Sequence, residues 1–299
     1  MAACDICPRA CLVDRELATG YCGAGSTPHI ARAALHMWEE PCISGTRGSG
    51  TIFFCGCNLS CLFCQNHAIS HGAAGVQMDA GALADCMLQL QAQGAHNINL
   101  VTPAPHVPVL CKAIPMARQM GLRLPIVYNT NAYERVETLR RLEGFVDIYL
   151  PDIKYVTPVA ASRYSGAGDY FEYASKAVLE MQRQCGVLRL NPEGIAVRGL
   201  LVRHLVLPGS VDEARRVLGF IAKALPQATH ISLMGQYMPC HKASFAPLNR
   251  KLLRREYERA IEHCVSLGFT NVLIQSLSSA DSAFVPPFAA QNEENIAKL

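Results

Sequence analysis

Three cysteines stand close together in the run Cys-Asn-Leu-Ser-Cys-Leu-Phe-Cys, at Cys57, Cys61 and Cys64. A [4Fe–4S] cluster is normally held by four cysteine thiolates, so a short loop with three would leave one iron without a protein ligand. An open coordination position is typical of a catalytic metal site and is absent from a purely structural one. The spacing therefore predicts a cluster with one reactive iron. A zinc knuckle and buried thiols without metal are the alternatives, although no histidine or fourth cysteine follows at knuckle spacing.

A second cysteine group lies at the start of the chain, and its members are Cys4, Cys7, Cys11 and Cys22. Glycine and proline, which favour turns, flank these residues. Four thiolates in so short a segment suit a tetrahedral site for zinc or a single iron, or a second iron–sulfur cluster. Such a segment has little core of its own, so we expect the metal to hold it together or to relay electrons. Reduced thiols without metal are the alternative.

The overall composition describes a globular chain that does not depend on disulfides. Because a chain of this length buries roughly 75% of its unfolded surface, its 14 cysteines are not needed for stability. Their clustering instead predicts metal binding in a reducing compartment. Charged residues stand near the N-terminus, so no secretory signal is expected, and no apolar run approaches the ~20 residues of a membrane-spanning helix. We expect a cytoplasmic protein without a membrane partner.

The charge of the chain does not select a macromolecular partner. The net charge is +3, and the sequence pI of about 8.2 is below the value of about 9 that is typical of nucleic-acid-binding domains. The basic residues from 250 to 255 alternate with Glu256 and Glu258 at helical spacing, which indicates a solvated helix face. A nucleic-acid partner is therefore not expected.

Beyond residue 50, short apolar runs alternate with amphipathic stretches, a pattern that predicts βα units and a parallel sheet. We predict strands at 51–54, 97–101, 126–128, 146–150, 200–206, 230–234 and 272–274. One predicted helix starts at Asp79 and ends at Gly94, and the other main helices cover 108–120, 170–184 and 250–267. Six or seven such strands predict an α/β fold with an incomplete (β/α)6-type barrel.

Polar residues follow these strands at the positions where a barrel of this kind places its chemistry. The cysteine loop follows the first predicted strand, the run from Asn129 to Asn131 follows the third, and Asp152 and Lys154 follow the fourth. Arg203 lies within the fifth strand among apolar neighbours, where an unpaired charge would be costly to bury. We therefore expect a site at the carboxyl ends of the strands.

The cysteine run resembles, at every position, the signature of the radical S-adenosylmethionine (SAM) enzymes, in which an aromatic residue such as Phe63 precedes the last cysteine. From about Glu39 to Ser276 the chain is similar to the PflX-type branch of that family, which is related to the pyruvate formate-lyase activating enzymes. The matching stretches are 43–54, the cysteine loop with Gln65 and Asn66, 147–155, 203–208 and 233–239.

The resemblance implies an oxidoreductase that binds a [4Fe–4S] cluster and SAM and generates a 5′-deoxyadenosyl radical. Asp152 and Lys154 match the Asp-x-Lys pair that activating enzymes place near SAM. Lys154 and Arg203 are the expected partners of the SAM carboxylate, and Asp152 and Asn129 those of its ribose or amino group; Phe63 also belongs to this set. Structural roles are the alternatives, with Arg203 paired to Asp152 and the other polar residues acting as loop caps.

The sequence also departs from the family pattern. Activating enzymes carry a Gly-Gly-Glu run after the second strand for the SAM amino group, and this chain has Thr102-Pro103-Ala104-Pro105-His106 there. We take Thr102 as the substitute. Cys42 and Cys55 stand where proline and serine are expected, and we interpret them as thiols without a role in the site. No inserted eight-cysteine ferredoxin segment is present.

The resemblance favours a glycyl-radical enzyme as the substrate, through hydrogen abstraction from a protein glycine, and a small molecule or another peptide is the alternative. It also implies an electron donor such as flavodoxin or ferredoxin. A hypothesis from another class is a non-catalytic iron–sulfur or zinc module that binds a partner or transfers electrons. We divide the chain into an N-terminal metal-binding segment (1–38), a radical SAM partial barrel (39–276) and a C-terminal tail (277–299).

Overall fold

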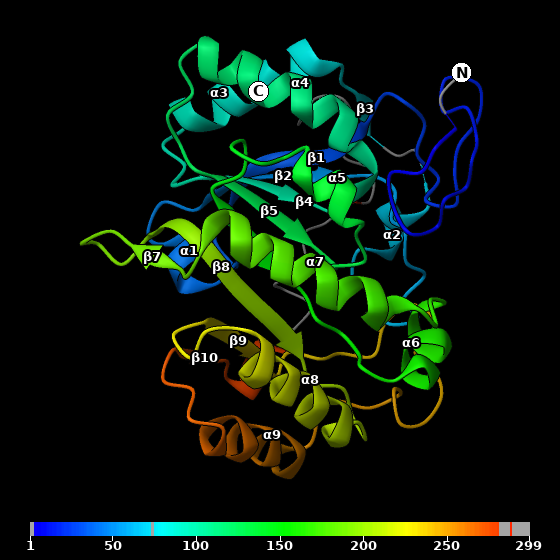
Figure 1. The fold of residues 1–299 in the computed structure, drawn as a ribbon, viewed down its shortest axis with the longest axis vertical. Coiled ribbons are helices and arrows are strands. Elements are labelled where there is room, and N and C mark those ends of the chain that lie inside the picture. Colours follow the sequence, from blue (N-terminus) through cyan, green and yellow to red (C-terminus); the bar gives the residue numbers. More distant parts are fainter. Residues whose placement is uncertain (1–2, 73–74, 281–287, 289–299) are drawn as a thin grey trace.

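The computed structural model describes residues 3–72, 75–280 and 288. At its centre, parallel strands neighbour one another in chain order (Figure 1). These strands are β2 (Ser49–Phe54), β4 (Ile98–Val101), β5 (Ile126–Thr130), β6 (Ile148–Pro151), β8 (Ala196–Leu205), β9 (His230–Met234) and β10 (Val272–Ile274). Each overlaps a predicted strand, although the bounds differ by up to four residues, as at the start of β8. The predicted α/β fold with a largely parallel sheet is therefore confirmed.

Three further strands are antiparallel to their neighbours, and sequence reasoning missed all three. β1 (His29–His36) pairs with β2, β3 (Val76–Gln77) pairs with β1, and β7 (Arg189–Leu190) pairs with β8. The strand predicted as the first is thus the second. β1 contains three alanines, which are weak strand formers, and β3 and β7 have only two residues each, too few for a recognisable pattern.

Helices pack on the sheet and on one another. The longer helices are α3 (Ala80–Ala92), α4 (Val107–Gln119), α6 (Pro158–Ser165), α7 (Tyr170–Cys185), α8 (Val211–Ala224) and α9 (Arg254–Ser266). α3 contacts α4, β1, β2 and β4, while α7 packs on β6 and β8 and α8 on β8 and α9 (Figure 1). As predicted, Asp79 caps α3, because its side chain accepts a hydrogen bond from Ala82 N at 2.9 Å.

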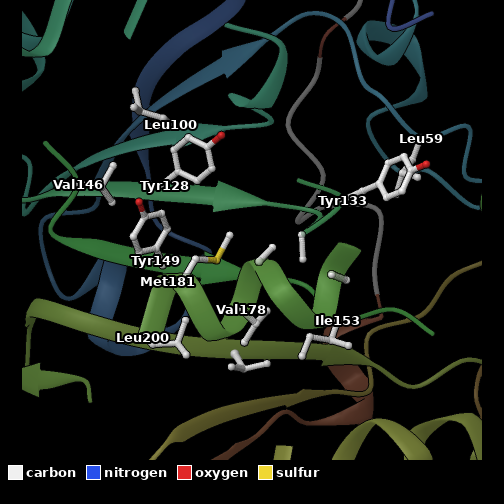
Figure 2. Packing of buried hydrophobic residues seen from close by; sticks show 14 of the residues in the cluster. Leu59, Leu100, Tyr128, Tyr133, Val146, Tyr149, Ile153, Val178, Met181 and Leu200 are labelled. Atoms are coloured by element: carbon white, nitrogen blue, oxygen red, sulfur yellow. The ribbon is translucent and has the colours of Figure 1, made fainter. Parts of the chain in front are cut away.

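The main core lies between the sheet and these helices. Tyr128, Tyr149 and Leu200 come from three neighbouring strands and face Val178 and Met181 of α7 (Figure 2). All five side chains are fully buried. Burying side chains of this size stabilises the fold by about 1.5–3 kcal/mol each. The layer fixes the relative heights of β5, β6 and β8, and with them the positions of the residues at their ends.

The opposite face of the same strands carries a second apolar cluster and then the polar residues. Side chains alternate between the two faces of a strand. Val127, Ile148 and Leu201 point away from α7 and pack with Ile43 of the short helix α1 (Pro41–Ser44). Nearer the carboxyl ends of the strands, the same face carries polar residues. Asn129 and Arg203 come two residues after Val127 and Leu201, and Asp152 comes four residues after Ile148. α1 therefore covers one end of this face and the polar residues occupy the other.

None of the helices in the described residues is long and apolar enough to cross a membrane.

Candidate functional site

The structure brings the three loop cysteines and all of the predicted cofactor-binding residues to one cavity of about 260 Å³. Its lining includes Cys57, Cys61, Phe63, Cys64, Asn129, Asp152, Lys154 and Arg203. Thr102, the substitute for the missing glutamate, lines it as well and has a positive φ of 59°. Residues that are far apart in the sequence thus share one site at the carboxyl ends of the parallel strands, where this architecture places its chemistry.

The cysteine loop after β2 is held in place by backbone hydrogen bonds to distant segments. Cys57 N donates to Cys22 O at 3.2 Å, and Leu62 N donates to Tyr164 O at 2.9 Å. Lys242 N donates in turn to Leu62 O at 2.8 Å. The loop is therefore fixed by the N-terminal segment, by α6 and by the segment after β9.

Each loop sulfur has a polar neighbour. Asn131 Nδ2 lies 3.4 Å from Cys57 Sγ, Ser165 Oγ lies 3.0 Å from Cys61 Sγ, and a serine hydroxyl also lies beside Cys64. Within the described ranges, no group of three or more His, Cys, Asp or Glu side chains has the placement of a metal-binding group. The loop thus presents three thiols to one cavity without a preformed coordination sphere.

The chemistry of the loop donors fits an iron–sulfur cluster. Burial, with a smaller contribution from the neighbouring thiols, raises the pKa of Cys57 to about 12. Burial likewise raises the pKa of Cys61. Thiols in this setting become thiolates only beside a cation, and a bound metal supplies that charge. A ligand set made of sulfur favours iron–sulfur clusters or zinc over ions that prefer oxygen.

Arg203 stands at the centre of a buried charged network. Its Nε donates to Asp152 Oδ1 at 2.7 Å, its Nη1 to Glu39 Oε2 at 3.0 Å and its Nη2 to Asn129 Oδ1 at 2.7 Å. A second carboxylate oxygen, Glu40 Oε2, lies 3.7 Å from Nη1. Of the two roles considered for Arg203, the pairing with Asp152 is therefore the arrangement that the structure shows. The guanidinium thus orients carboxylates at Nε and Nη1 and an amide oxygen at Nη2.

Lys154 is a second cation of the site, and its ammonium group has N–H donors that are not used within the described residues. Its Nζ donates to Asp152 Oδ2 at 3.0 Å, and this is its partner within the described residues. Burial by itself would lower the pKa of Lys154, but the attraction of Asp152 outweighs it and holds the pKa above its usual value. An ammonium group has three donors, so two remain for a ligand in the cavity.

Sequence reasoning missed two residues of this network, Glu39 and Glu40. Glu39 lines the cavity, and its Oε1 accepts from Asn99 Nδ2 at 3.1 Å and Asn129 Nδ2 at 3.3 Å. Glu40 is buried, and burial raises the pKa of its carboxyl. Two adjacent glutamates immediately before Pro41, at the start of a helix, were the available signal.

The N-terminal cysteines form a second sulfur-rich region. Cys11 Sγ accepts from Tyr21 N at 3.2 Å. A Cβ added at Gly20 would lie 3.3 Å from Cys11 Sγ and 3.8 Å from Cys22 Sγ, so both sulfurs flank this glycine. Burial raises the pKa of Cys7 to about 11. The cysteines of this region are free thiols, and the metal predicted for them stays a prediction.

Four histidines close to the site contact the backbone or each other. His106 approaches Cys55 O at 2.9 Å, and His204 approaches Ile153 O at 2.7 Å. Burial lowers the pKa of each to about 4. His67 and His241 stack on each other with ring centroids 4.8 Å apart. None of these four histidines lines the cavity.

Comparisons with known proteins give one relative and a shared fold. No protein-family model matches the chain. Uncharacterized protein MJ0674 of Methanocaldococcus jannaschii is 31% identical over 273 residues, which are 87% of this chain and 73% of that protein. The structure of SuiB from Streptococcus suis bound to precursor peptide SuiA has a TM-score of 0.50 at 11% identity, over 75% of this chain and 48% of that one. SuiB bound to S-adenosylmethionine has a TM-score of 0.47 at 12% identity, over 75% and 46%. The chain spans about half the length of SuiB, and the first of these structures shows that the two share a fold.

Proposed function

The chain belongs to the same family as uncharacterized protein MJ0674 of Methanocaldococcus jannaschii, and we propose that it is a radical SAM enzyme of the PflX-type branch. One observation carries this proposal. The three cysteines of the loop, spaced as in radical SAM enzymes, line the same cavity as Lys154 and the carboxylate network around Arg203. The parallel strands lie beside one another in the order in which they occur along the chain, and this supports the partial barrel that this family implies.

Cys57, Cys61 and Cys64 would hold a [4Fe–4S] cluster by three of its irons. When bound, such a cluster supplies the electron that cleaves SAM to methionine and a 5′-deoxyadenosyl radical. The chain contributes the shape and charge of the cavity, and Phe63 provides an apolar wall beside the loop.

The charged residues divide the recognition of SAM between them. Lys154 has two donors for the methionine carboxylate, a charge-assisted contact of the stronger kind. Glu39 and Asp152 are acceptors for the ammonium group and the ribose hydroxyls. Arg203 is a positioning residue, because its hydrogen bonds hold both of these carboxylates in place. Asn129 links Arg203 to Glu39 and so belongs to the same frame.

The substrate implied by the PflX resemblance is a glycine in a protein, from which the radical removes hydrogen, as in the activation of a glycyl-radical enzyme. A second candidate is a shorter peptide, because SuiB, which shares the fold, was solved with a precursor peptide. The electron would come from a flavodoxin or ferredoxin in the cytoplasm. The N-terminal cysteines would hold zinc or a second iron site next to the loop.

The test is the formation of 5′-deoxyadenosine. The full chain is reconstituted anaerobically with iron and sulfide, reduced with dithionite and given SAM. We expect 5′-deoxyadenosine from the unsubstituted chain and none from Cys57→Ala. Cys55→Ala is the matched control, since Cys55 lies two positions away and its thiol is not among the residues that line the cavity. No product despite an intact cluster would support the non-catalytic module instead.

A further inference from the structure

The three sulfurs of the cysteine loop differ in the hydrogen-bond donors that their neighbours provide. Hydrogen bonds to cluster sulfurs are one of the factors that set the reduction potential of an iron–sulfur cluster. A thiolate only accepts hydrogen bonds, so the direction of each neighbouring donor decides its effect. The directions can be worked out here from the partners of Asn131, Ser165 and Ser70.

The side-chain amide of Asn131 is locked with its nitrogen toward Cys57. Tyr133 N donates to Asn131 Oδ1 at 2.9 Å, so the oxygen is the end that faces the backbone. Asn131 Nδ2 donates to Asn58 Oδ1 at 2.9 Å and to Cys57 Sγ at 3.4 Å. Asn58 is itself fixed, since its Nδ2 donates to Tyr133 O at 2.6 Å. Both amide orientations are thereby determined, and one N–H of Asn131 points at the sulfur.

The hydroxyl of Ser165 is directed in a similar way toward Cys61. Ser165 Oγ lies 3.0 Å from Cys61 Sγ and 3.0 Å from the hydroxyl of Tyr155. A cysteine that is a thiolate cannot donate, and within the described residues the Tyr155 hydroxyl has Ser165 Oγ as its acceptor. Every proton therefore finds an acceptor only when Tyr155 donates to Ser165 and Ser165 donates to the sulfur. Tyr155 is fully buried and then donates to Ser165 Oγ. The result is a chain of hydroxyls from Tyr155 to Ser165 to Cys61.

Ser70 looks equivalent and is not. Its Oγ lies 3.2 Å from Cys64 Sγ, but it donates to Asn66 O at 2.9 Å, four residues earlier. A hydroxyl has one proton. The contact with Cys64 is therefore close in distance but provides no donor to a thiolate.

We propose that Asn131 and Ser165 are positioning residues that donate hydrogen bonds to the cluster thiolates of Cys57 and Cys61 and raise the reduction potential of the cluster, whereas Ser70 has no such effect. This inference rests on the proposed function, because it requires the cluster. The reduced cluster carries one more negative charge than the oxidised one, and a donor at the sulfur stabilises the more negative form.

The experiment is a redox titration of the reconstituted full chain, in which the electron paramagnetic resonance signal of the reduced cluster is followed against applied potential. The variants are Asn131→Leu, Ser165→Ala and Ser70→Ala as the matched control, each with its iron and sulfide content measured. We expect more negative midpoint potentials for Asn131→Leu and Ser165→Ala, additive in the double variant, and an unchanged midpoint for Ser70→Ala. Electron–nuclear double resonance in H₂O and D₂O should show an exchangeable proton coupling that disappears in Ser165→Ala.

Because Asn131 also caps the backbone of Tyr133, its variant can lose the cluster altogether, and Ser165→Ala then decides. A Ser165→Ala cluster with full iron content, the same midpoint as Ser70→Ala and an unchanged proton coupling overturns the inference. A cluster that forms but yields no 5′-deoxyadenosine overturns the proposed function alone, and the potentials still test the hydrogen bonds. An unsubstituted chain that assembles no cluster overturns both.

Discussion

Arg203 and Asp152 are joined twice, by a hydrogen bond of 2.7 Å from the guanidinium Nε to Oδ1 and by a parallel backbone bridge between the two residues. The bridge fixes the position of the Asp152 backbone along β8, and the side-chain hydrogen bond fixes the orientation of the Asp152 carboxylate. Lys154 reaches the other oxygen of the same carboxylate. One buried carboxylate therefore holds two cations, and they have different roles in the site.

Replacing Arg203 with Met should destabilise the fold. The substitution would leave Asp152, Glu39 and Glu40 buried with less positive charge, and breaking a buried ion pair in this way costs about 3–5 kcal/mol. Urea unfolding of the reduced protein measures the loss. Arg254→Met is the control, because its ion pair with Glu258 lies at the surface and should cost about 1 kcal/mol or less. Equal losses in the two variants would contradict the structural role of Arg203.

Replacing Lys154 with Met should weaken SAM binding without unfolding the chain. Asp152 keeps its bond to Arg203, while the ligand loses a charge-assisted hydrogen bond that is worth about 1.5–3 kcal/mol, or roughly 10- to 100-fold in Kd. Calorimetric titration of SAM into the reconstituted protein measures the change. Lys242→Met is the control, since Lys242 is exposed and outside the cavity lining. Unchanged SAM affinity in Lys154→Met would remove this residue from the site.

Several of these residues could be found from the sequence because strand periodicity and chain position mark them. Asn129, Asp152 and Arg203 lie on or directly after apolar runs that any βα pattern would recognise as strands. The direction of the sheet then brings their side chains to one edge, as the structure shows.

The remaining residues of the site could not be found in this way, because their contacts are long-range. Glu39 meets Arg203 across 164 positions of the sequence, and it lies outside the βα repeat. Ser165 meets Cys61 across 104 positions, from the end of a helix that the pattern did not reveal. The partner of Arg203 could not be predicted for a similar reason, since local sequence does not show which acid reaches a buried guanidinium.

The stability of the chain should fall with increasing pH because of Glu134. This carboxyl is fully buried, its Oε1 accepts from Thr130 and Tyr128, and its Oε2 has no hydrogen-bond partner within the described residues. Burial raises the pKa of Glu134 from 4.5 to about 7. Between these values the folded chain holds a proton that the unfolded chain has released, so the free energy of unfolding decreases as pH rises, and the full penalty is present above pH 7.

Glu134→Gln cannot ionise and should remove this trend. Relative to the unsubstituted chain, its unfolding free energy should gain little near pH 4.5 and about 3 kcal/mol near pH 8. Urea unfolding at several pH values measures the difference. Glu137→Gln, at an exposed position three residues later, controls for the loss of one carboxylate. A constant gain across the pH range would show that Glu134 is charged in the folded chain at all of these values.

Replacing Cys4 with Ser should separate the two cysteine groups. We expect loss of the N-terminal metal and retention of the loop cluster, because the contact from Cys22 to the loop uses a backbone carbonyl and not a thiol. Metal analysis and the visible absorption of the cluster measure the two sites. Cys111→Ser, on α4 away from both groups, is the control. Loss of the cluster in Cys4→Ser would mean that the cysteines are divided between the sites in another way.

The central claim is that one iron of the loop cluster has no protein ligand and binds SAM. Electron–nuclear double resonance of the reduced cluster with SAM labelled at its amino nitrogen (¹⁵N) and carboxylate carbon (¹³C) tests it most directly. We predict hyperfine couplings from both labels, which appear only when SAM is bound and are absent from unlabelled samples. A cluster with no coupling to either label, or a fourth protein ligand at that iron, would contradict the account.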